Sequence, residues 1–282
     1  MGRYREQITR IIFFMAASVS VAAVILICLF LFFNGIPAIK KIGIDEFTGG
    51  ELWRPSQGDF GIFPMIIGSI YVTAGAVIIG VPIGVLCAIF MAKYCHRRIY
   101  GILKSSVELM AGIPSVVYGF FGLMVIVPVI QELFGGSGRG ILTASVLLGI
   151  MILPTIINIS EDSIRAVPEN YYEGSLALGA TKERSITKTV LPAARTGIMS
   201  GVILGTGRAI GETMAVVMVC GNQAVMPESI TSGLRTLTTN IVLEMGYAAE
   251  LHRDALIGTA VVLFVFVFVI NISFSVLKRG SK

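Results

Sequence analysis

Charged side chains are scarce in this sequence of 282 residues. Asp, Glu, Lys and Arg together make up 14% of the chain, whereas apolar residues make up 55%. A soluble domain of ordinary composition has about 25% charged residues, because its surface must be hydrated. The deficit therefore excludes an ordinary water-soluble domain and predicts an integral membrane protein.

Cysteine and histidine are also few. The four cysteines show neither paired nor CxxC spacing, which argues against a disulfide framework and a zinc site. The two histidines, His96 and His252, lie too far apart in the chain to indicate a metal centre. We therefore expect no metal site.

The motifs of hydrolytic enzymes are missing as well. No Gly-Lys pair occurs, so the chain lacks the G-x-x-x-x-G-K-[ST] phosphate loop, and neither H-E-x-x-H nor G-x-S-x-G is present. The basic residues have no interleaved aromatic residues, which argues against nucleic-acid binding. We expect no catalytic residues and no nucleic-acid partner, and any ATP that drives this protein must be hydrolysed by another chain.

Long apolar runs predict six transmembrane helices. A helix of about 20 residues crosses a hydrocarbon core of roughly 30 Å, because each residue advances it by about 1.5 Å. Five charge-free runs provide such helices, and a sixth run holds Arg208 and Glu212 in its interior. The expected spans are 11–33, 67–91, 109–131, 140–160, 196–222 and 255–277.

The distribution of basic residues predicts the orientation, since Lys and Arg accumulate in cytoplasmic loops. Fifteen of the 22 basic residues lie at the two ends of the chain and in the connections between spans two and three and spans four and five. Six lie in the other connections, and Arg208 lies inside a span. We therefore expect a multi-pass protein of the plasma (inner) membrane with both termini in the cytoplasm.

The inner connection 161–195 has the pattern of a docking element. Pro168 suits the first position of a short helix, and Gly179 is placed to end it in a left-handed conformation. Thr181 can cap a second short helix that ends before Leu191. Two such helices on the inner membrane face would fit a groove of a partner protein, although an interfacial helix pair without a partner has the same pattern.

The same connection resembles the EAA loop of type-1 ABC-importer permeases, a family of CysTW-like membrane subunits. Small residues stand where the family has two alanines after the glutamate, and Thr189 stands where it has isoleucine. The resemblance implies an all-α, six-helix MetI-like fold and a coupling helix that docks into a cleft of an ABC ATPase. The implied coupling residues are Glu173, Gly174, Ser175, Gly179, Ala180, Leu191 and Pro192.

Four segments in the same order resemble the C-type permeases of phosphate-specific ABC importers. These segments are 61–64, 111–119, 177–181 and 207–215, and the similarity extends over 61–277. The resemblance implies a second, PstA-like permease, a PstB-like ATPase dimer and a PstS-like extracytoplasmic phosphate-binding protein. ATP and Mg would be bound by the ATPase, and this chain would need no cofactor of its own.

The function that the resemblance implies is import of inorganic phosphate, driven by ATP hydrolysis on a partner. Residues 1–65 would form the N-terminal tail, first transmembrane helix and outer loop, 66–277 the permease domain, and 278–282 a basic cytoplasmic tail. Molybdate, tungstate and sulfate remain alternatives because their shape and charge are similar. A secondary anion transporter and an inert assembly subunit are the other classes.

An ionisable pair in the fifth span is the candidate substrate site. Arg208 and Glu212 are four residues apart, so on a helix they lie about 40° apart and can pair. Charged groups are costly in hydrocarbon and face protein or a pathway. Gly197, Gly201 and Gly205 lie on the same half of the helix and would let another helix approach. Because the arginine fork matches phosphate oxygens, we expect an anion way-station, with a strut between helices as the alternative.

Overall fold

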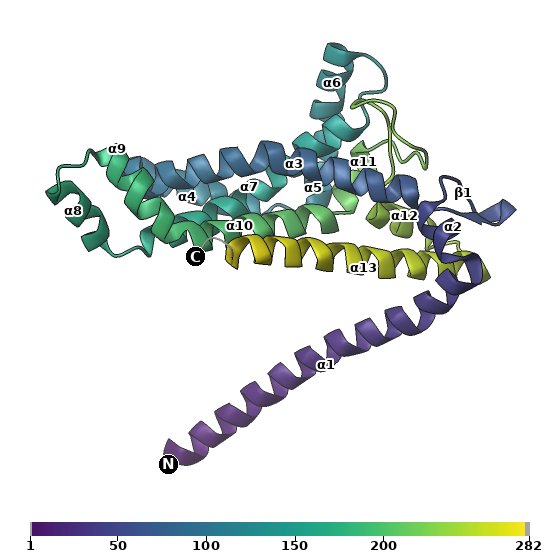
Figure 1. Ribbon diagram of the computed structural model, residues 1–282, viewed down its shortest axis with the longest axis horizontal. Coiled ribbons are helices and arrows are strands. Elements are labelled where there is room, and N and C mark those ends of the chain that lie inside the picture. Colours follow the sequence, from purple (N-terminus) through teal and green to yellow (C-terminus); the bar gives the residue numbers. More distant parts are fainter. Residues whose placement is uncertain (1, 280–282) are drawn as a thin grey trace.

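Three long helices form the centre of the computed structural model, which describes residues 2–279. They are α3 (Phe63–Ile89), α7 (Ile141–Arg165) and α10 (Leu191–Gly211). The three helices run along the long axis of the molecule, and α7 packs against both of the others (Figure 1). Leu147, Leu148 and Ile152 of α7 are fully buried, so the core follows this central helix.

Glycine allows the close approach of α10 to α7. A Cβ atom on Gly197 would clash with Ser163 of α7, and one on Gly205 would lie 2.8 Å from Cγ1 of Ile156. Gly201 faces the same helix. The predicted glycine ridge is thus confirmed as a packing surface, and the helix that approaches it belongs to the same chain.

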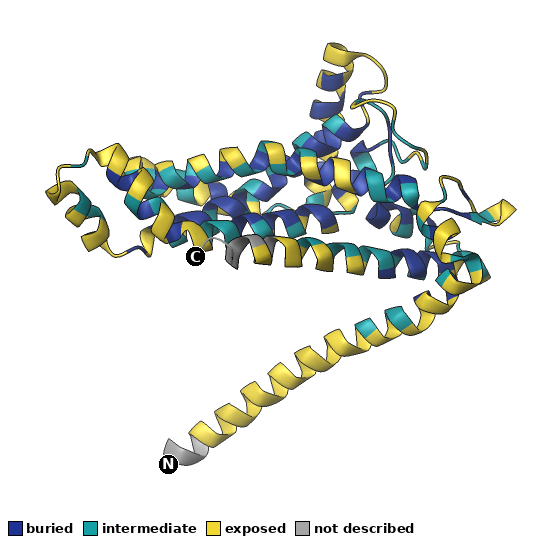
Figure 2. Ribbon diagram, in the orientation of Figure 1, coloured by how far each residue is buried: buried dark blue, intermediate teal, exposed yellow. Residues whose placement is uncertain are grey.

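The first and last spans are α1 (Gly2–Ile42) and α13 (Glu250–Arg279). They meet along the C-terminal part of α1, where the rings of Phe32 and Phe264 pack edge to face with centroids 5.7 Å apart. Towards its N-terminus α1 leaves the body of the molecule (Figure 1), and Figure 2 shows it exposed there. Its apolar side chains are free to contact lipid or a second membrane subunit. Residues 280–282 of the predicted basic tail lie outside the described residues.

The third span begins later than predicted. Residues 97–112 form a separate helix, α4 (Arg97–Gly112), and the chain is extended at Ile113 and Pro114. Proline disfavours helical geometry in the residue before it, which explains the break. The span then runs through α5 (Ser115–Phe121), the π-helical η3 (Gly122–Ile126) and α6 (Val127–Phe134). The prediction of 109–131 was wrong at its start because the apolar end of α4 extends the hydropathy signal.

The second span begins earlier than predicted. Helix α3 starts at Phe63 rather than near residue 67, because Pro64 occupies its first turn, where a missing N–H group costs nothing. At the other end the helix continues into the π-helical η2 (Phe90–Tyr94). The fourth span agrees with the prediction at its start and continues to Arg165.

Five helices of the described residues are long and apolar enough to cross a membrane, whereas six spans were predicted. The sixth, α10, contains Arg195 and Arg208 and does not reach the same hydropathy, so the sixth crossing stays a prediction. The continuous helix expected over 196–222 is also wrong: α10 ends at Gly211, and α11 (Met214–Val219) follows as a separate short helix. The five segments are Glu6–Ile42, Phe63–Tyr94, Ser115–Phe134, Ile141–Arg165 and Glu250–Ser273.

A second, smaller core lies at the end of the molecule that carries the segment after α1. It includes α2 (Ile44–Gly49) and a hairpin of β1 (Trp53–Arg54) and β2 (Asp59–Phe60), joined by the 3-10 turn η1 (Pro55–Gln57). These elements pack on α12 (Leu237–Glu244) and on the start of α13. The predicted outer loop is therefore folded against the rest of the chain.

Candidate functional site

The inner connection forms two short helices separated by glycine, as predicted. The first is α8 (Glu169–Ala177), and Gly179 follows it with φ of 88°, a left-handed conformation that suits glycine. Thr181 caps α9 (Lys182–Ser185) by accepting a hydrogen bond from the backbone N–H of Arg184. One detail differs, because Pro168 precedes α8 as its N-cap residue instead of occupying the first helical position.

The second short helix does not end before Leu191, which corrects the prediction. The π-helical segment η4 (Ile186–Val190) leads from α9 straight into α10. The backbone N–H of Leu191 donates to the carbonyl of Ile186, five residues back. This wider turn absorbs the irregularity that Pro192 introduces, since proline has no N–H to offer. The helical backbone is thus continuous from α9 through η4 into α10.

The coupling residues implied by the sequence are divided between two faces of the loop. Glu173, Gly174 and Gly179 are exposed. Ala180 and Leu191 are partly buried, and Pro192 is exposed at the start of α10. The motif therefore combines a solvent-facing surface on α8 with the packed root of the loop.

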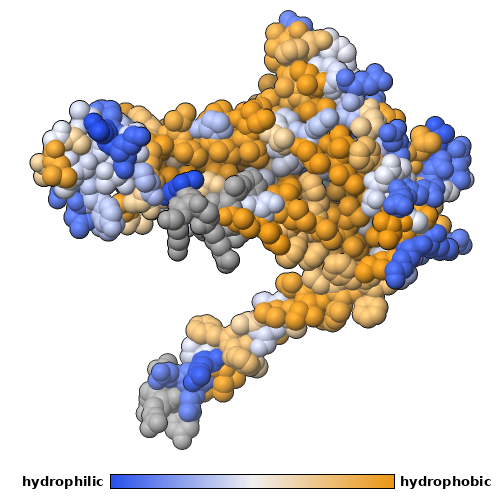
Figure 3. Space-filling view, viewed as in Figure 1, coloured by the Kyte–Doolittle hydropathy of each residue, from blue (hydrophilic) through white to orange (hydrophobic). Residues whose placement is uncertain are grey.

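Leu178 is the most exposed large apolar side chain of the loop, and the sequence reasoning missed it. It is 91% exposed at the turn after α8. Figure 3 shows that hydrophilic side chains gather on the end of the molecule formed by α8 and α9. Leu178 therefore places a single apolar side chain among polar neighbours, where it is free to contact a partner. The sequence signal that could have indicated this exposure is that Leu178 directly precedes Gly179, the glycine that ends α8.

Two residues that differ from the EAA-loop pattern, Ser175 and Thr189, contact each other. The hydroxyl of Thr189 donates to Oγ of Ser175, and the two oxygens are 3.4 Å apart. Ser175 stands where the family has alanine, and Thr189 stands where it has isoleucine. This polar contact joins α8 to η4.

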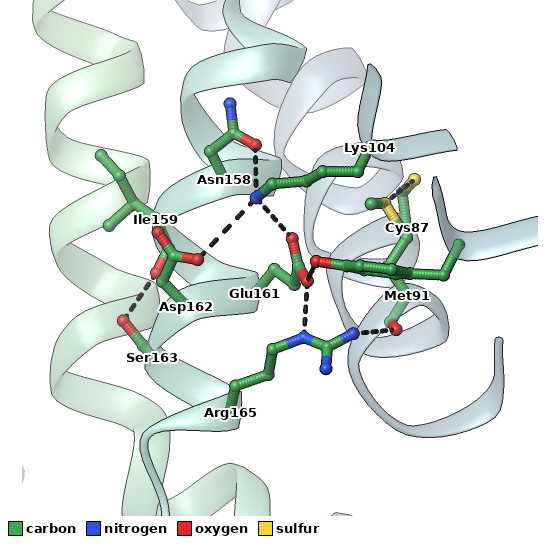
Figure 4. A network of polar contacts seen from close by, with 10 residues as sticks. Cys87, Met91, Lys104, Asn158, Ile159, Glu161, Asp162, Ser163 and Arg165 are labelled. Carbon is green, nitrogen blue, oxygen red and sulfur yellow. Dashed lines mark hydrogen bonds and ion pairs between the residues drawn. The ribbon is translucent and has the colours of Figure 1, made fainter. Parts of the chain in front are cut away.

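A buried carboxylate at the root of the loop organises the neighbouring helices (Figure 4). The side chain of Glu161 in α7 has no exposed surface. Its oxygens lie 2.8 Å from Nζ of Lys104, 2.7 Å from Oη of Tyr100 and 2.6 Å from Nε of Arg165. Arg165 also donates from Nη2 to the carbonyl of Met91 at 3.0 Å.

This network joins three elements that lie far apart in the sequence. Lys104 and Tyr100 belong to α4, Glu161 and Arg165 to α7, and Met91 to η2. A buried charge that loses its partners is strongly destabilising, so the contacts fix α4 against the root of the loop. Sequence reasoning did not find the network, although a carboxylate four residues before an arginine at the end of an apolar span was visible.

Arg208 and Glu212 do not pair, which contradicts the expectation for the fifth span. No ion pair joins them in residues 2–279. Because α10 ends at Gly211, Glu212 turns towards α11, where its Oε1 accepts hydrogen bonds from the backbone N–H groups of Thr213 and Ala215. Arg208 is exposed on α10 and has no hydrogen-bonding partner within the described part of the chain. Its charge is therefore available to a group outside this chain.

A second buried carboxylate, that of Glu244, lies at the opposite end of the molecule. Glu244 of α12 accepts hydrogen bonds from Nε1 of Trp53 at 2.8 Å and from Arg235, and lies 2.8 Å from Nε2 of His252. Burial would raise the pKa of Glu244, but the hydrogen bonds from Trp53, Arg235 and His252 outweigh it and hold the pKa below its usual value. Trp53 is buried and attaches the β1–β2 hairpin to α12.

The described residues contain no group of three or more His, Cys, Asp or Glu placed to hold a metal ion. What they do contain is a bundle of membrane-crossing helices and a glycine-broken helix pair joined without interruption to α10. Such an architecture is that of a multi-pass membrane protein with a short helix pair at one end (Figure 1).

Comparison with known proteins identifies the family. The chain belongs to the binding-protein-dependent transport system inner membrane components, whose family model matches residues 80–280. The chain is 39% identical to the probable ABC transporter permease protein YqgH of Bacillus subtilis, over 96% of this chain and 90% of that protein. It is 35% identical to the phosphate transport system permease protein PstC of Mesorhizobium japonicum, over 85% and 80% of the two chains.

Solved structures agree with this assignment at the level of the fold. A membrane chain of the inward-facing MetNI methionine ABC transporter superposes with a TM-score of 0.63 at 18% identity, over 82% of this chain and all of that one. A chain of a bacterial ABC transporter involved in alginate import gives 0.66 at 15% identity, over 99% of both chains. The predicted MetI-like permease fold is confirmed.

Proposed function

We propose that this chain is a permease subunit of an ABC importer for inorganic phosphate. The observation that carries the proposal is the identity of 34% to 35% with several PstC phosphate permeases over more than four fifths of this chain. Identity at this level over most of a membrane domain extends to the helices that line the substrate path. The catalytic step of ATP hydrolysis would lie on a partner, which binds ATP and Mg.

The ATPase, a PstB-like dimer, would dock on the exposed face of α8. Glu173, Gly174 and Gly179 present a surface of small and charged groups, and Leu178 offers an apolar side chain for a pocket. Closure of the ATPase dimer would displace α8 and α9 and, through η4, would move α10. The exposure of Leu178 supports this docking site, because its side chain packs on nothing else in the bundle and is free to enter a pocket of the ATPase.

Arg208 would meet the anion inside the membrane. Its guanidinium lacks a partner in residues 2–279, and its fork can bind two phosphate oxygens at once. Glu212 follows it four residues later in the sequence but is held by the start of α11, so it would limit the affinity by repulsion rather than by pairing. The pathway would run along the interface with a second, PstA-like permease, because a single chain leaves Arg208 at its surface.

The same arrangement supports the predicted orientation of the chain in the membrane. The described N-terminal end of α1 and the C-terminal end of α13 lie towards the end of the molecule that carries α8 and α9 (Figure 1). An ATPase on α8 is cytoplasmic, so both termini would lie in the cytoplasm. The β1–β2 hairpin would face outside, where a PstS-like binding protein delivers phosphate.

Uptake by cells tests the proposal. Cells that lack this chain but contain the partner subunits are complemented with the wild-type gene, and uptake of low-micromolar radiolabelled phosphate is measured with and without excess sulfate, molybdate or tungstate. We expect restored uptake that the other oxyanions do not reduce. Full competition by one of them would reassign the substrate to that anion.

A further inference from the structure

A cavity of about 340 Å³ lies between the inner connection 161–195, which we call the coupling loop, and the ends of α3 and α7 that adjoin it. Its volume falls in the range of roughly 300–1,000 Å³ that is usual for small-molecule sites. The lining comes from η2, α7, α8 and α9, so a bound molecule would contact four elements at once. The lining residues are Ala92, Lys93, Arg165, Glu169, Tyr172 and Lys182.

The cavity has an excess of positive charge. Three cationic side chains face a single carboxylate, that of Glu169. Nζ of Lys93 lies 3.4 Å from this carboxylate, but the Glu169 side chain is 61% exposed, and such ion pairs contribute little. Glu161, which binds Arg165, is buried outside the cavity lining and is shared with Lys104. Two positive charges are therefore not balanced within the cavity.

Tyrosine rings hold the three cationic groups in place. A ring under a cation fixes its position without neutralising it, so the charge remains available to an anion. The distances to the ring centroids are 5.3 Å for Lys93 Nζ over Tyr172, 4.3 Å for Arg165 Cζ over Tyr100, and 4.9 Å for Lys182 Nζ over Tyr94.

Hydrogen-bond donors also remain unused. Arg165 donates through Nε and Nη2, and Nη1 has no partner among residues 2–279. Lys182 forms no ion pair within the same residues. The free Nη1 group of Arg165 and the two lysine ammonium groups are cationic hydrogen-bond donors of the kind that bind phosphate oxygens.

We propose that this cavity binds a phosphate group, supplied either by the headgroup of an anionic phospholipid or by a free phosphate ion. Its place beside the ends of two membrane-crossing helices is where lipid headgroups lie, and it opens on the face that the coupling loop shares with the cytoplasm. A bound phosphate would hold α8 against η2 and thereby restrict the coupling loop. The site is separate from Arg208 and does not depend on which anion is transported.

Binding to the purified full chain tests the proposal in two arms. In the first, native mass spectrometry counts the phosphatidylglycerol or phosphatidylcholine molecules retained from mixed nanodiscs. In the second, calorimetry measures binding of inorganic phosphate in a neutral detergent, with Arg208→Gln in every variant to remove the proposed pathway site. The test variants are Lys182→Gln and Lys93→Gln/Lys182→Gln, and the control is Lys188→Gln, an exposed basic residue of the same loop that does not line the cavity.

We expect the protein with an intact cavity to bind in at least one arm. Lys182→Gln should lower the affinity by about fivefold and the double variant by roughly 30-fold. The control Lys188→Gln should bind with unchanged affinity. Selective retention of phosphatidylglycerol assigns the lipid headgroup, and affinity for phosphate alone assigns the free ion. The proposal is overturned if neither arm shows binding, or if Lys182→Gln binds as the wild type does. Lys182 is exposed and forms no ion pair in the described chain, so its variant is expected to fold normally.

Discussion

Among single residues, Arg208 combines a fixed charge with a position on α10, a predicted membrane span, and has no hydrogen-bond or ion-pair partner in the described chain. Its guanidinium keeps its charge whatever its burial, so it must be satisfied by an anion, by water or by a second subunit. This distinguishes it from Arg165 and Arg235, which are bound by the buried carboxylates of Glu161 and Glu244.

Replacing Arg208 by glutamine therefore tests the anion pathway. We expect Arg208→Gln to reduce phosphate uptake by about 100-fold or more while the subunits still copurify, because a charge-assisted bidentate contact is worth roughly 3 kcal/mol. Uptake and copurification are measured on the same cells. Arg195→Gln, an exposed arginine of the same helix, is the control. Loss of assembly in Arg208→Gln would show that the residue is a strut.

Glu244 has a predicted pH signature. Its pKa is lower in the folded than in the unfolded protein, so its stabilising contribution is complete above the unfolded value of 4.5 and is lost as the pH falls through the folded value. At neutral pH we expect Glu244→Gln to cost about 3 kcal/mol, because Arg235 loses its buried partner.

Thermal unfolding of the detergent-solubilised chain between pH 4 and pH 7 measures this effect. The difference between wild type and Glu244→Gln should be constant above about pH 5 and shrink below 4.5. Glu132→Gln, at an exposed carboxylate on α6, should show no difference at any pH. A difference in stability between wild type and Glu244→Gln that grows as the pH falls below 4.5 would contradict the contacts assigned to Glu244.

At the scale of elements, the contact between α7 and α10 depends on glycine. Replacing Gly197 by valine would place side-chain atoms where Ser163 already lies, and overpacking of this kind costs about 1–3 kcal/mol or more. We expect Gly197→Val to unfold at a lower temperature than the wild type. Gly207→Ala, on the same helix, has no atom within 4 Å of the added Cβ, so it should not lower the unfolding temperature and should raise it slightly through the better helix propensity of alanine. Equal stability of the two variants would contradict the packing.

The coupling loop offers a test that leaves the fold intact. Leu178 is 91% exposed, so Leu178→Ser should not affect the stability of the isolated chain. If Leu178 fills a pocket of the ATPase, the change should weaken copurification of that subunit by about 30-fold, the effect of losing a contact worth about 2 kcal/mol. Leu52→Ser, at an exposed leucine at the opposite end of the molecule, is the control. Unchanged copurification and uptake would exclude Leu178 from the interface.

Local signals in the sequence predicted most of the elements. Hydropathy located five spans, and the left-handed Gly179 and the Thr181 cap follow from short-range backbone chemistry. The errors have equally local causes: Pro114 breaks a run that hydropathy reads as continuous, and Gly211 ends the helix on which Arg208 and Glu212 were expected to pair.

The contacts of the buried charged residues could not be predicted from the sequence, for a different reason. Glu161 meets Lys104 and Tyr100 across 57 and 61 residues of sequence, and Trp53 meets Glu244 across 191. Neither spacing nor composition indicates which distant side chains will meet, since this is set by how the helices pack. The role of Arg208 in a substrate pathway stays a prediction, and the separation of Arg208 from Glu212 was not predicted from the sequence.

For the whole molecule, the arrangement of the helices supports the proposed role of a permease subunit that responds to a partner at the end carrying α8 and α9. The helix pair α8–α9 continues through η4 into α10, which packs along α7, so a displacement at one end reaches the membrane core. The long exposed face of α1 and the unpartnered Arg208 both leave surfaces for further subunits. A chain with these features is expected to transport nothing alone.

The most direct measurement is uptake of radiolabelled phosphate into proteoliposomes that contain this chain with its partner permease and ATPase, with ATP and Mg at the face that carries α8 and the loaded binding protein at the other. We predict uptake that stops when ATP is omitted, when the binding protein is left out, or when this chain is present without its partners. Uptake by the chain alone, or at the same rate without ATP, would contradict the account and point to a secondary transporter.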